Sequence, residues 1–219
     1  MAELPEGFDL KPDFIGREDE ISLLAAIQSL EFREFQMHGV TAKRRVVQFG
    51  WRYSFGTYGL TPTLPLPEAF EPVRAQAAGF AGVSPDDFAE ALVTEYQPGA
   101  GIGWHRDAPP FDIVAGISLG GSCRMRFQRG TGTAREVCAV ELPPRSIYLL
   151  TGSARKNWQH TIPPAKELRY SITFRTLRHK PRAKRETAGK KPRRKTGQSA
   201  TGDGRATGRF QSPNGFRQP

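Results

Sequence analysis

Apolar positions recur every three or four residues in two stretches near the N-terminus, a spacing that places side chains on one face of a helix. These stretches predict helices over 17–31 and 67–80. Their apolar stripes are Ile21, Leu24, Ile27 and Leu30 in the first, and Phe70, Val73, Ala77 and Phe80 in the second. A serine, a proline and two aspartates at 84–87 predict the start of a third, short helix, because serine caps a first turn and proline fits its first position.

Alternation replaces the helical spacing over 44–58, where many of the aromatic and β-branched residues lie two positions apart. After residue 92 the chain consists mostly of short apolar segments separated by Gly and Pro turns. We predict strands over 93–96, 104–107, 113–119, 125–127, 137–142, 146–150, 158–161 and 170–177. Helices followed by many short strands predict a mainly β protein with flanking helices (α+β), in which the strands form a sandwich or jelly roll and the helices buttress one sheet.

The net charge of +10 resides in the last part of the chain. Residues 179–219 contain twelve Lys/Arg and two Asp/Glu, whereas the rest of the chain contains twenty of each. This segment cannot bury enough apolar surface to offset its ordering entropy. We therefore predict a neutral folded body followed by a disordered basic tail. Such a tail fits binding to nucleic acid phosphates or, alternatively, a solubilising role.

The remaining bulk features favour a protein of the cytoplasm. Cys123 and Cys138 have no metal-binding spacing and are expected to be reduced, partly buried thiols. The N-terminus lacks a basic region followed by an apolar run, and no apolar stretch reaches the roughly 18 residues of a membrane span. We expect a cytoplasmic protein, nucleoid-associated if its source is bacterial, that has no membrane partner and is monomeric.

His105 and Asp107 form an HxD pair within a predicted strand. Alternate residues of a strand project to the same side, so the imidazole and the carboxylate point toward one spot. A third ligand would have to come from His38 or His160, the other histidines of the predicted folded body. Two histidines and one carboxylate leave three positions open on an octahedral ion, which suits Fe(II) that binds a chelating cosubstrate and O₂. An isolated HxD is also common as a surface pair or as a satisfied polar group of the core.

The predicted strand at 169–175 places positive charge where an anion could bind. Arg169, Ser171, Thr173 and Arg175 share one of its faces, while apolar residues share the other. If the arginine face points inward, two buried guanidinium groups are costly unless an anion pairs with them, and arginine binds a carboxylate through two hydrogen bonds. If it points outward, the same pattern is an ordinary solvated face.

Four segments in this order resemble the AlkB family of Fe(II)/2-oxoglutarate dioxygenases, which remove alkyl groups from nucleobases by oxidation. They are 95–107 with its HxD, 117–120, His160, and the Arg-x₅-Arg segment 169–175. The resemblance covers 88–178 and implies a double-stranded β-helix. It also implies that His105, Asp107 and His160 hold the iron as catalytic residues, with 2-oxoglutarate and O₂ as cosubstrates.

The same resemblance implies roles around 2-oxoglutarate. Arg169 would pair with its distal carboxylate, Tyr96 would hydrogen-bond the same end, and Arg175 would lie near the carboxylate that chelates the metal. Ser171 and Thr94 stand where the family's bacterial pattern has asparagine. Hydrogen bonds to the cosubstrate at these two positions are therefore expected to differ in detail.

Substrate contacts are expected from 45–58, which resembles the aromatic lid that covers the flipped base in this family. Trp51, Tyr53 and Tyr58 are the candidates for base stacking, because a base must leave its stack to react and aromatic faces receive it there. These aromatics could equally pack the lid onto the sheet. Pro109 stands where some members carry an acid that meets an exocyclic amino group, so no preference among alkylated bases follows.

We therefore divide the chain into N-terminal helices and lid (1–86), a dioxygenase core (87–178) and the basic tail (179–219). The predicted function is oxidative demethylation of alkylated nucleobases in DNA or RNA, with single strands expected as substrate. 2-Oxoglutarate would be decarboxylated to succinate, and formaldehyde would be released. Two alternatives remain: the same oxygenase chemistry on a protein side chain, and a non-catalytic nucleic-acid-binding protein whose basic tail is the active part.

Overall fold

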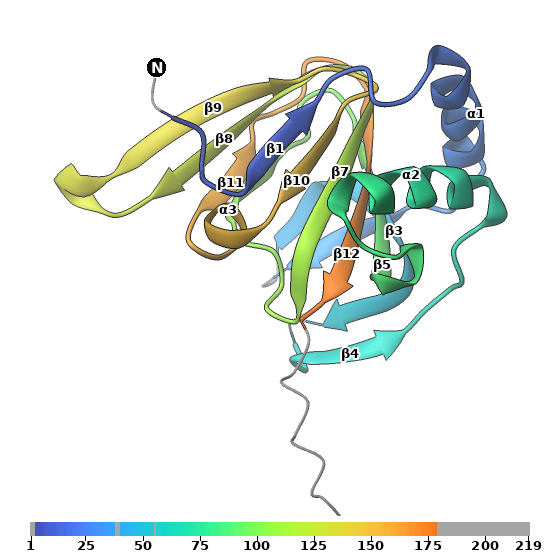
Figure 1. Cartoon of the computed structure of the whole chain (residues 1–219), viewed down its shortest axis with the longest axis horizontal. Coiled ribbons are helices and arrows are strands. Elements are labelled where there is room, and N and C mark those ends of the chain that lie inside the picture. The colour runs from blue at the N-terminus through green and yellow to red at the C-terminus, as the bar shows by residue number, and fades with distance from the viewer. Residues whose placement is uncertain (1–2, 38–39, 55, 179–219) are drawn as a thin grey trace, which may run out of the picture. The chain divides into compact units, whose positions relative to one another are not determined.

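The computed structural model describes residues 3–37, 40–54 and 56–178, which contain two β-sheets and flanking helices (Figure 1). The predicted basic tail, 179–219, and His38 lie outside the described residues. Among the described residues, no helix is both long enough and apolar enough to cross a membrane.

The two sheets are built from antiparallel strand pairs. Within the described residues, the larger sheet has eight strands and the smaller has four. The larger sheet runs in the order β1 (Phe8–Lys11), β10 (Ile147–Leu150), β7 (Phe111–Gly120), β12 (Arg169–Leu177), β5 (Phe88–Tyr96), β3 (Val40–Ser54) and β2 (Arg33–Met37), and β4 (Gly59–Pro62) pairs with β3. The smaller sheet runs in the order β6 (Ile102–His105), β11 (Gln159–Ile162), β8 (Cys123–Arg129) and β9 (Glu136–Leu142).

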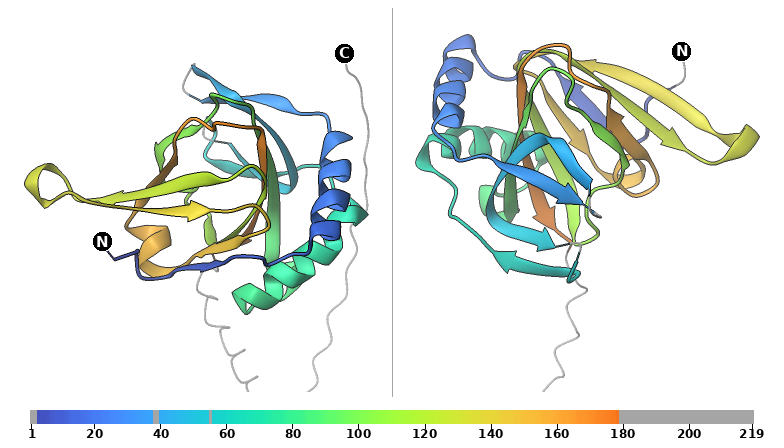
Figure 2. Two further views of the ribbon diagram at one scale, coloured as in Figure 1. Left: turned by 90° about the horizontal axis from the view of Figure 1, so that it is seen from above. Right: turned by 180° about the vertical axis from the view of Figure 1, so that it is seen from behind.

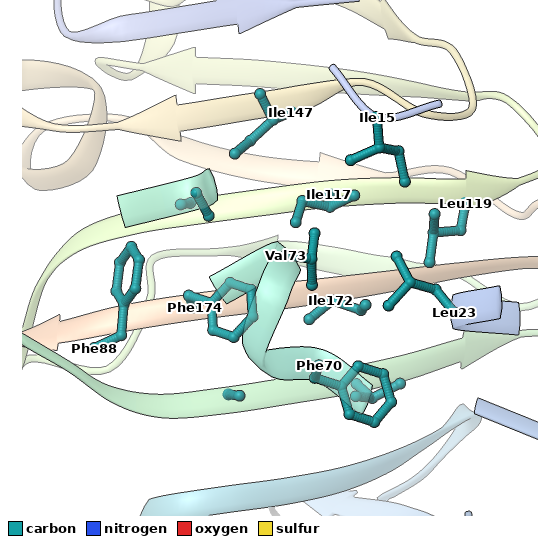
Figure 3. Packing of buried hydrophobic residues seen from close by; sticks show 14 of the residues in the cluster. Ile15, Leu23, Phe70, Val73, Phe88, Ile117, Leu119, Ile147, Ile172 and Phe174 are labelled. Atoms are coloured by element: carbon teal, nitrogen blue, oxygen red, sulfur yellow. The ribbon is translucent and has the colours of Figure 1, made fainter. Parts of the chain in front are cut away.

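Helices α1 (Arg17–Gln28) and α2 (Glu71–Ala81) pack on the outer face of the larger sheet, on the side away from the β8–β9 hairpin (Figure 2). Apolar side chains at this interface include Leu23, Phe70, Val73, Ile117, Ile172 and Phe174, each at most 5% exposed (Figure 3). Burying one such side chain contributes about 1.5–3 kcal/mol, so this layer is a main source of stability. The short helices are η1 (Glu68–Phe70), η2 (Pro85–Asp87), η3 (Gly132–Ala134) and α3 (Gly152–Lys156).

A second apolar cluster lies between the two sheets and combines inward side chains of both. It includes Met125, Phe127 and Leu142 from the smaller sheet and Val114 and Leu150 from the larger one. The two cysteines are free thiols buried in this cluster, as expected. Two facing sheets with helices on one outer face confirm the predicted fold class.

Most predicted elements are present, with shifted ends. The helix predicted over 17–31 ends at Gln28, the one over 67–80 divides into η1 and α2, and the third is a single 3₁₀ turn, η2. Strands β1, β2 and β4 and helix α3, each of four or five residues, were not predicted. Strands from both sides of the proposed boundary at 86/87 share the larger sheet, so that boundary lies inside one fold.

Gly50 marks the point where β3 changes partners. Up to Gly50, β3 pairs with β5, and from Trp51 to Ser54 it pairs with β4. The φ of Gly50 is +77°, and a Cβ there would lie 2.3 Å from the carbonyl oxygen of Ala89. Glycine alone tolerates both the left-handed backbone and this close approach. We call the paired segments beyond it, 51–54 and 59–62, the β3–β4 ribbon.

Replacing Gly50 with alanine should therefore lower the free energy of unfolding by about 1–3 kcal/mol for the backbone strain alone. Urea denaturation of the variant measures the loss. The matched control is Gly79→Ala in α2, where a Cβ meets nothing within 4 Å and the backbone is helical. That change should stabilise the protein by about 0.5–1 kcal/mol. Equal effects of the two substitutions would contradict this account of Gly50.

Candidate active site

The three predicted iron ligands come together on the inner side of the smaller sheet. His105 ends β6 and pairs in register with His160 of β11, which brings the ring centroids to 4.2 Å. Asp107 follows β6 by two residues, and its Oδ2 lies 3.7 Å from Nε2 of His160. All three line a cavity of about 240 Å³ between the two sheets.

Free donor atoms on these side chains fit a metal ion. The Nδ1 of His105 lies 2.9 Å from the carbonyl oxygen of Gly103, so Nδ1 carries the proton and Nε2 is left for a metal. The Oδ2 of Asp107 is buried and has no hydrogen-bond partner among the described residues.

Two ligands at right angles on one ion lie about 3 Å apart, because metal–ligand bonds are about 2.1 Å long. The 3.7 Å separation between Asp107 and His160 is somewhat wider. In the part of the chain that the structure describes, no three His, Cys, Asp or Glu side chains are already gathered closely enough for a metal site. Binding an ion would therefore have to draw these donors together.

The electrostatics of the site favour the protonation states that a metal requires. Burial, together with the neighbouring His105, lowers the pKa of His160 to about 3, so its imidazole is neutral at physiological pH. Burial alone would raise the pKa of Asp107, but Arg175 and the two histidines hold it well below its usual range. Two neutral imidazoles and one carboxylate are a donor set suited to Fe(II) with open positions.

Arg169 lies at the other end of the cavity and fits a carboxylate. It is 1% exposed, and its Nη2 donates to Oγ of Ser118 at 3.2 Å. Its Nε and Nη1 have no partner among the described residues, and the guanidinium lies 4.6 Å over the ring of Tyr96. A buried guanidinium with unpaired donors is costly unless an anion completes it. The arginine face of β12 therefore points inward, and the solvated-face alternative is excluded.

Arg175 is already paired within the protein. Its Nε and Nη2 donate to Oδ1 of Asp107 at 2.9 and 2.7 Å, and its Nη1 donates to Oε2 of Glu90 at 2.8 Å. It thus holds the carboxylate predicted to bind the metal. Ser171 and Thr94 stand opposite each other on β12 and β5 and line the middle of the cavity. Their short hydroxyls leave more room there than asparagine side chains would.

The predicted substrate contacts differ in position. Tyr53 lines the cavity, together with Arg44 and Gln48 from the same strand. Trp51 and Tyr58 are 40% and 79% exposed and do not line it. Trp51 lies on the same paired segment as Tyr53, beyond Gly50, whereas Tyr58 follows the end of β3.

Three residues near the site were not predicted. Glu90 lines the cavity, and an acid between apolar neighbours in 88–93 was its only signal in the sequence. Tyr148 covers Gly116, whose missing side chain leaves room for the ring. Arg155 is buried and donates to the carbonyl oxygens of Ala108 and Phe111 at 2.8 Å, which fixes the loop after Asp107. Nothing in the sequence around Arg155 or Tyr148 marks this role.

With this donor set and anion site, the sequence matches the 2OG-Fe(II) oxygenase superfamily over residues 8–184. The chain belongs to this superfamily. It is a dioxygenase that uses Fe(II) as its metal and 2-oxoglutarate and O₂ as cosubstrates. Arg169 offers unpaired donors to an anion, and Asp107 an unpaired oxygen to a metal, so the residues present fit both groups.

Curated relatives show that this oxygenase is AlkB-like. It is 28% identical to the alkylated DNA repair protein ALKBH8 homolog of Arabidopsis thaliana, covering 80% of this chain and 59% of that protein. It is 29% identical to the tRNA (carboxymethyluridine(34)-5-O)-methyltransferase ALKBH8 of Macaca fascicularis, covering 73% of this chain and 24% of that protein. The chain thus spans less than two thirds of the length of either relative.

Solved structures share the fold of the oxygenase. OsALKBH1 superposes with a TM-score of 0.63 at 15% identity, covering 80% of this chain and 99% of that one. A prolyl-4-hydroxylase from Pseudomonas putida superposes with a TM-score of 0.56 at 15% identity, covering 80% and 94%. Both confirm the double-stranded β-helix architecture.

Proposed function

We propose that this oxygenase removes alkyl groups from nucleobases of single-stranded DNA or RNA. The observation that carries the proposal is the rim of the cavity, where Trp104 and Arg106 stand beside the predicted iron ligands. Arg126 does not line the cavity, but its guanidinium lies over the Trp104 indole. The Arabidopsis relative is named for repair of alkylated DNA and the macaque relative for a tRNA modification. Both names support a nucleic acid as the substrate class.

The rim combines stacking and positive charge. Trp104 and Arg106 flank His105 in the sequence and line the cavity. Arg126 of β8 reaches over β11 and lies 5.5 Å from the centre of the Trp104 ring. Aromatic faces stack on bases of single strands, and guanidinium groups pair with phosphates. A nucleotide whose base enters the cavity would find partners here for its phosphate and its neighbouring base.

When bound, Fe(II) with 2-oxoglutarate and O₂ would supply the oxidation of the alkyl carbon, and the products would be formaldehyde, the restored base, succinate and CO₂. The protein positions the participants. His105, Asp107 and His160 would hold the metal, and Arg169 would hold the distal carboxylate of the cosubstrate. Tyr53 on the β3–β4 ribbon would contact the base.

The test is turnover with defined oligonucleotides. Purified protein loaded with Fe(II) and 2-oxoglutarate is given methylated single-stranded DNA, methylated RNA, the unmethylated strands, or a peptide mixture, and succinate and formaldehyde are measured. We expect formaldehyde only with methylated strands. Its amount should equal the increase in succinate over a reaction without any strand. Formaldehyde or hydroxylated product with peptides alone would instead identify the protein side-chain alternative.

Arg126→Ala should raise the KM for a methylated oligonucleotide and lessen its dependence on salt. Losing one phosphate contact to a single strand should reduce the slope of log affinity against log salt by about 0.7. The control is Arg124→Ala on the same strand, whose side chain is 65% exposed and paired with Glu141 at 3.8 Å. Indistinguishable slopes for the two variants and the wild type would remove Arg126 from the interface.

A further inference from the structure

A series of hydrogen-bonded polar side chains, buried or partly buried, leads from β3 to Asp107, the predicted metal ligand. Gln48 donates through Nε2 to Oε1 of Glu90 at 3.1 Å. Oε2 of Glu90 accepts from Nη1 of Arg175 at 2.8 Å, and Arg175 donates in turn to Oδ1 of Asp107.

The register of the strands brings the side chains of this series together. Glu90 of β5 stands opposite Arg175 of β12 on one side and opposite Gly50 of β3 on the other. Gln48 lies two residues before Gly50 and therefore on the same inner face. Glu90 thus occupies the centre of three adjacent strands, with no side chain at Gly50 to compete for its space.

Burial makes this arrangement demanding. Glu90 is 3% exposed, and the side chains of Arg175 and Asp107 are 11% and 4% exposed. A buried ion pair is weak evidence for stability, because desolvation offsets much of the attraction. Three ionised groups joined in one series are better explained by a requirement for fixed geometry than by a gain in folding energy.

The geometry at Asp107 shows what is being fixed. Arg175 occupies Oδ1 with two donors, so Oδ2 is the oxygen left for a metal. Arginine has a long side chain with several rotamers, and two contacts to one oxygen do not set its position. The contact between its third nitrogen and Glu90 supplies the missing anchor.

We propose that Glu90 is a positioning residue for metal binding: it anchors Arg175, which orients Asp107 so that Oδ2 faces the ion. Gln48 holds the other oxygen of Glu90 and ties this support to β3, the strand that also carries Tyr53. The inference rests on the iron-ligand assignment and is independent of the nucleobase substrate.

Three substitutions of Glu90 separate the effect of its side-chain length from the effect of its negative charge. Glu90→Asp keeps the charge but is too short to contact Arg175, Glu90→Gln keeps the reach without the charge, and Glu90→Ala removes both. The readout is the dissociation constant for Fe(II), measured without O₂ by competition with a chelator. Loss of an outer partner of a metal ligand typically costs about 10–100-fold in affinity. We expect that loss for the Asp and Ala variants and a smaller one for Gln.

The matched control is Glu95→Gln. Glu95 is on the same strand, joins the same two strands through its ion pair with Arg45 at 2.8 Å, and projects from the opposite face. The Glu95→Gln variant should bind Fe(II) with the same affinity as the wild type. Urea denaturation of the metal-free variants identifies any variant that fails to fold.

Two results would overturn the proposal. Wild-type affinity in Glu90→Asp would show that the charge alone matters, and wild-type affinity in Glu90→Ala would show that Arg175 needs no anchor. Asp107→Ala serves as the reference. If that variant also binds Fe(II) normally, the ligand assignment itself fails, and the two failures are thereby distinguished.

Discussion

Asp107→Ala is expected to abolish succinate release while the fold survives. The carboxylate would supply one of three protein ligands, and its loss would remove the metal contribution to catalysis, which is worth several kcal/mol. A loss of about 4 kcal/mol corresponds to about 10³-fold in rate. The measurement is succinate release at saturating 2-oxoglutarate, with and without a methylated oligonucleotide.

Asp107→Asn is the companion variant, because an amide can still accept from Arg175 but carries no negative charge for the metal. It should be as inactive as the alanine variant and closer to the wild type in stability. In the alanine variant, Arg175 loses its ion pair with Asp107 and keeps only the one with Glu90. Breaking a buried ion pair lowers the free energy of unfolding by about 3–5 kcal/mol. Normal turnover in either variant would remove the HxD motif from the active site.

Arg169→Met should raise the dissociation constant of 2-oxoglutarate by about 30- to 5,000-fold, because truncating one partner of a buried charge pair costs about 2–5 kcal/mol. Isothermal titration without O₂ measures this directly. The control is Arg45→Met, which loses an ion pair with Glu95 on the opposite face and should bind the cosubstrate normally.

Although Arg169→Met should weaken cosubstrate binding, it should not destabilise the fold of the cosubstrate-free protein. Without cosubstrate, the guanidinium is buried with two unpaired nitrogens, so methionine at this position should leave the Tm unchanged or higher. Added 2-oxoglutarate at 100 times its Kd should stabilise the wild type by about 2.7 kcal/mol and the variant hardly at all. A marked loss of Tm in the cosubstrate-free variant would mean that Arg169 has a structural role instead.

The sequence predicted the two faces of the strand at 169–175 correctly, because alternation is a local property of the chain. Its apolar face packs against the helices, and its arginine face points into the cavity. The meeting of His105 with His160 depends instead on the pairing of β6 with β11. Residue patterns contain no register, so only the resemblance selected His160 over His38.

Contacts formed across distant strands account for the rest of what was missed. Glu90 is 85 residues from Arg175 in the chain, and Arg155 is 47 residues from Ala108. No local period marks such pairs. Trp51, Tyr53 and Tyr58 were predicted together as base-stacking candidates, whereas in the structure Tyr53 lines the cavity and Trp51 and Tyr58 are exposed.

The change of strand partners at Gly50 also separates two groups of predicted functional residues. The predicted metal and cosubstrate groups stand on strands of the two sheets or, in the case of Asp107, two residues after one, whereas Tyr53 stands on a two-stranded extension beyond Gly50. We expect substitutions on that extension to change which substrate is admitted without disturbing the residues predicted to bind the metal and the cosubstrate. An enzyme built this way can change its substrates through evolution without having to reinvent its chemistry.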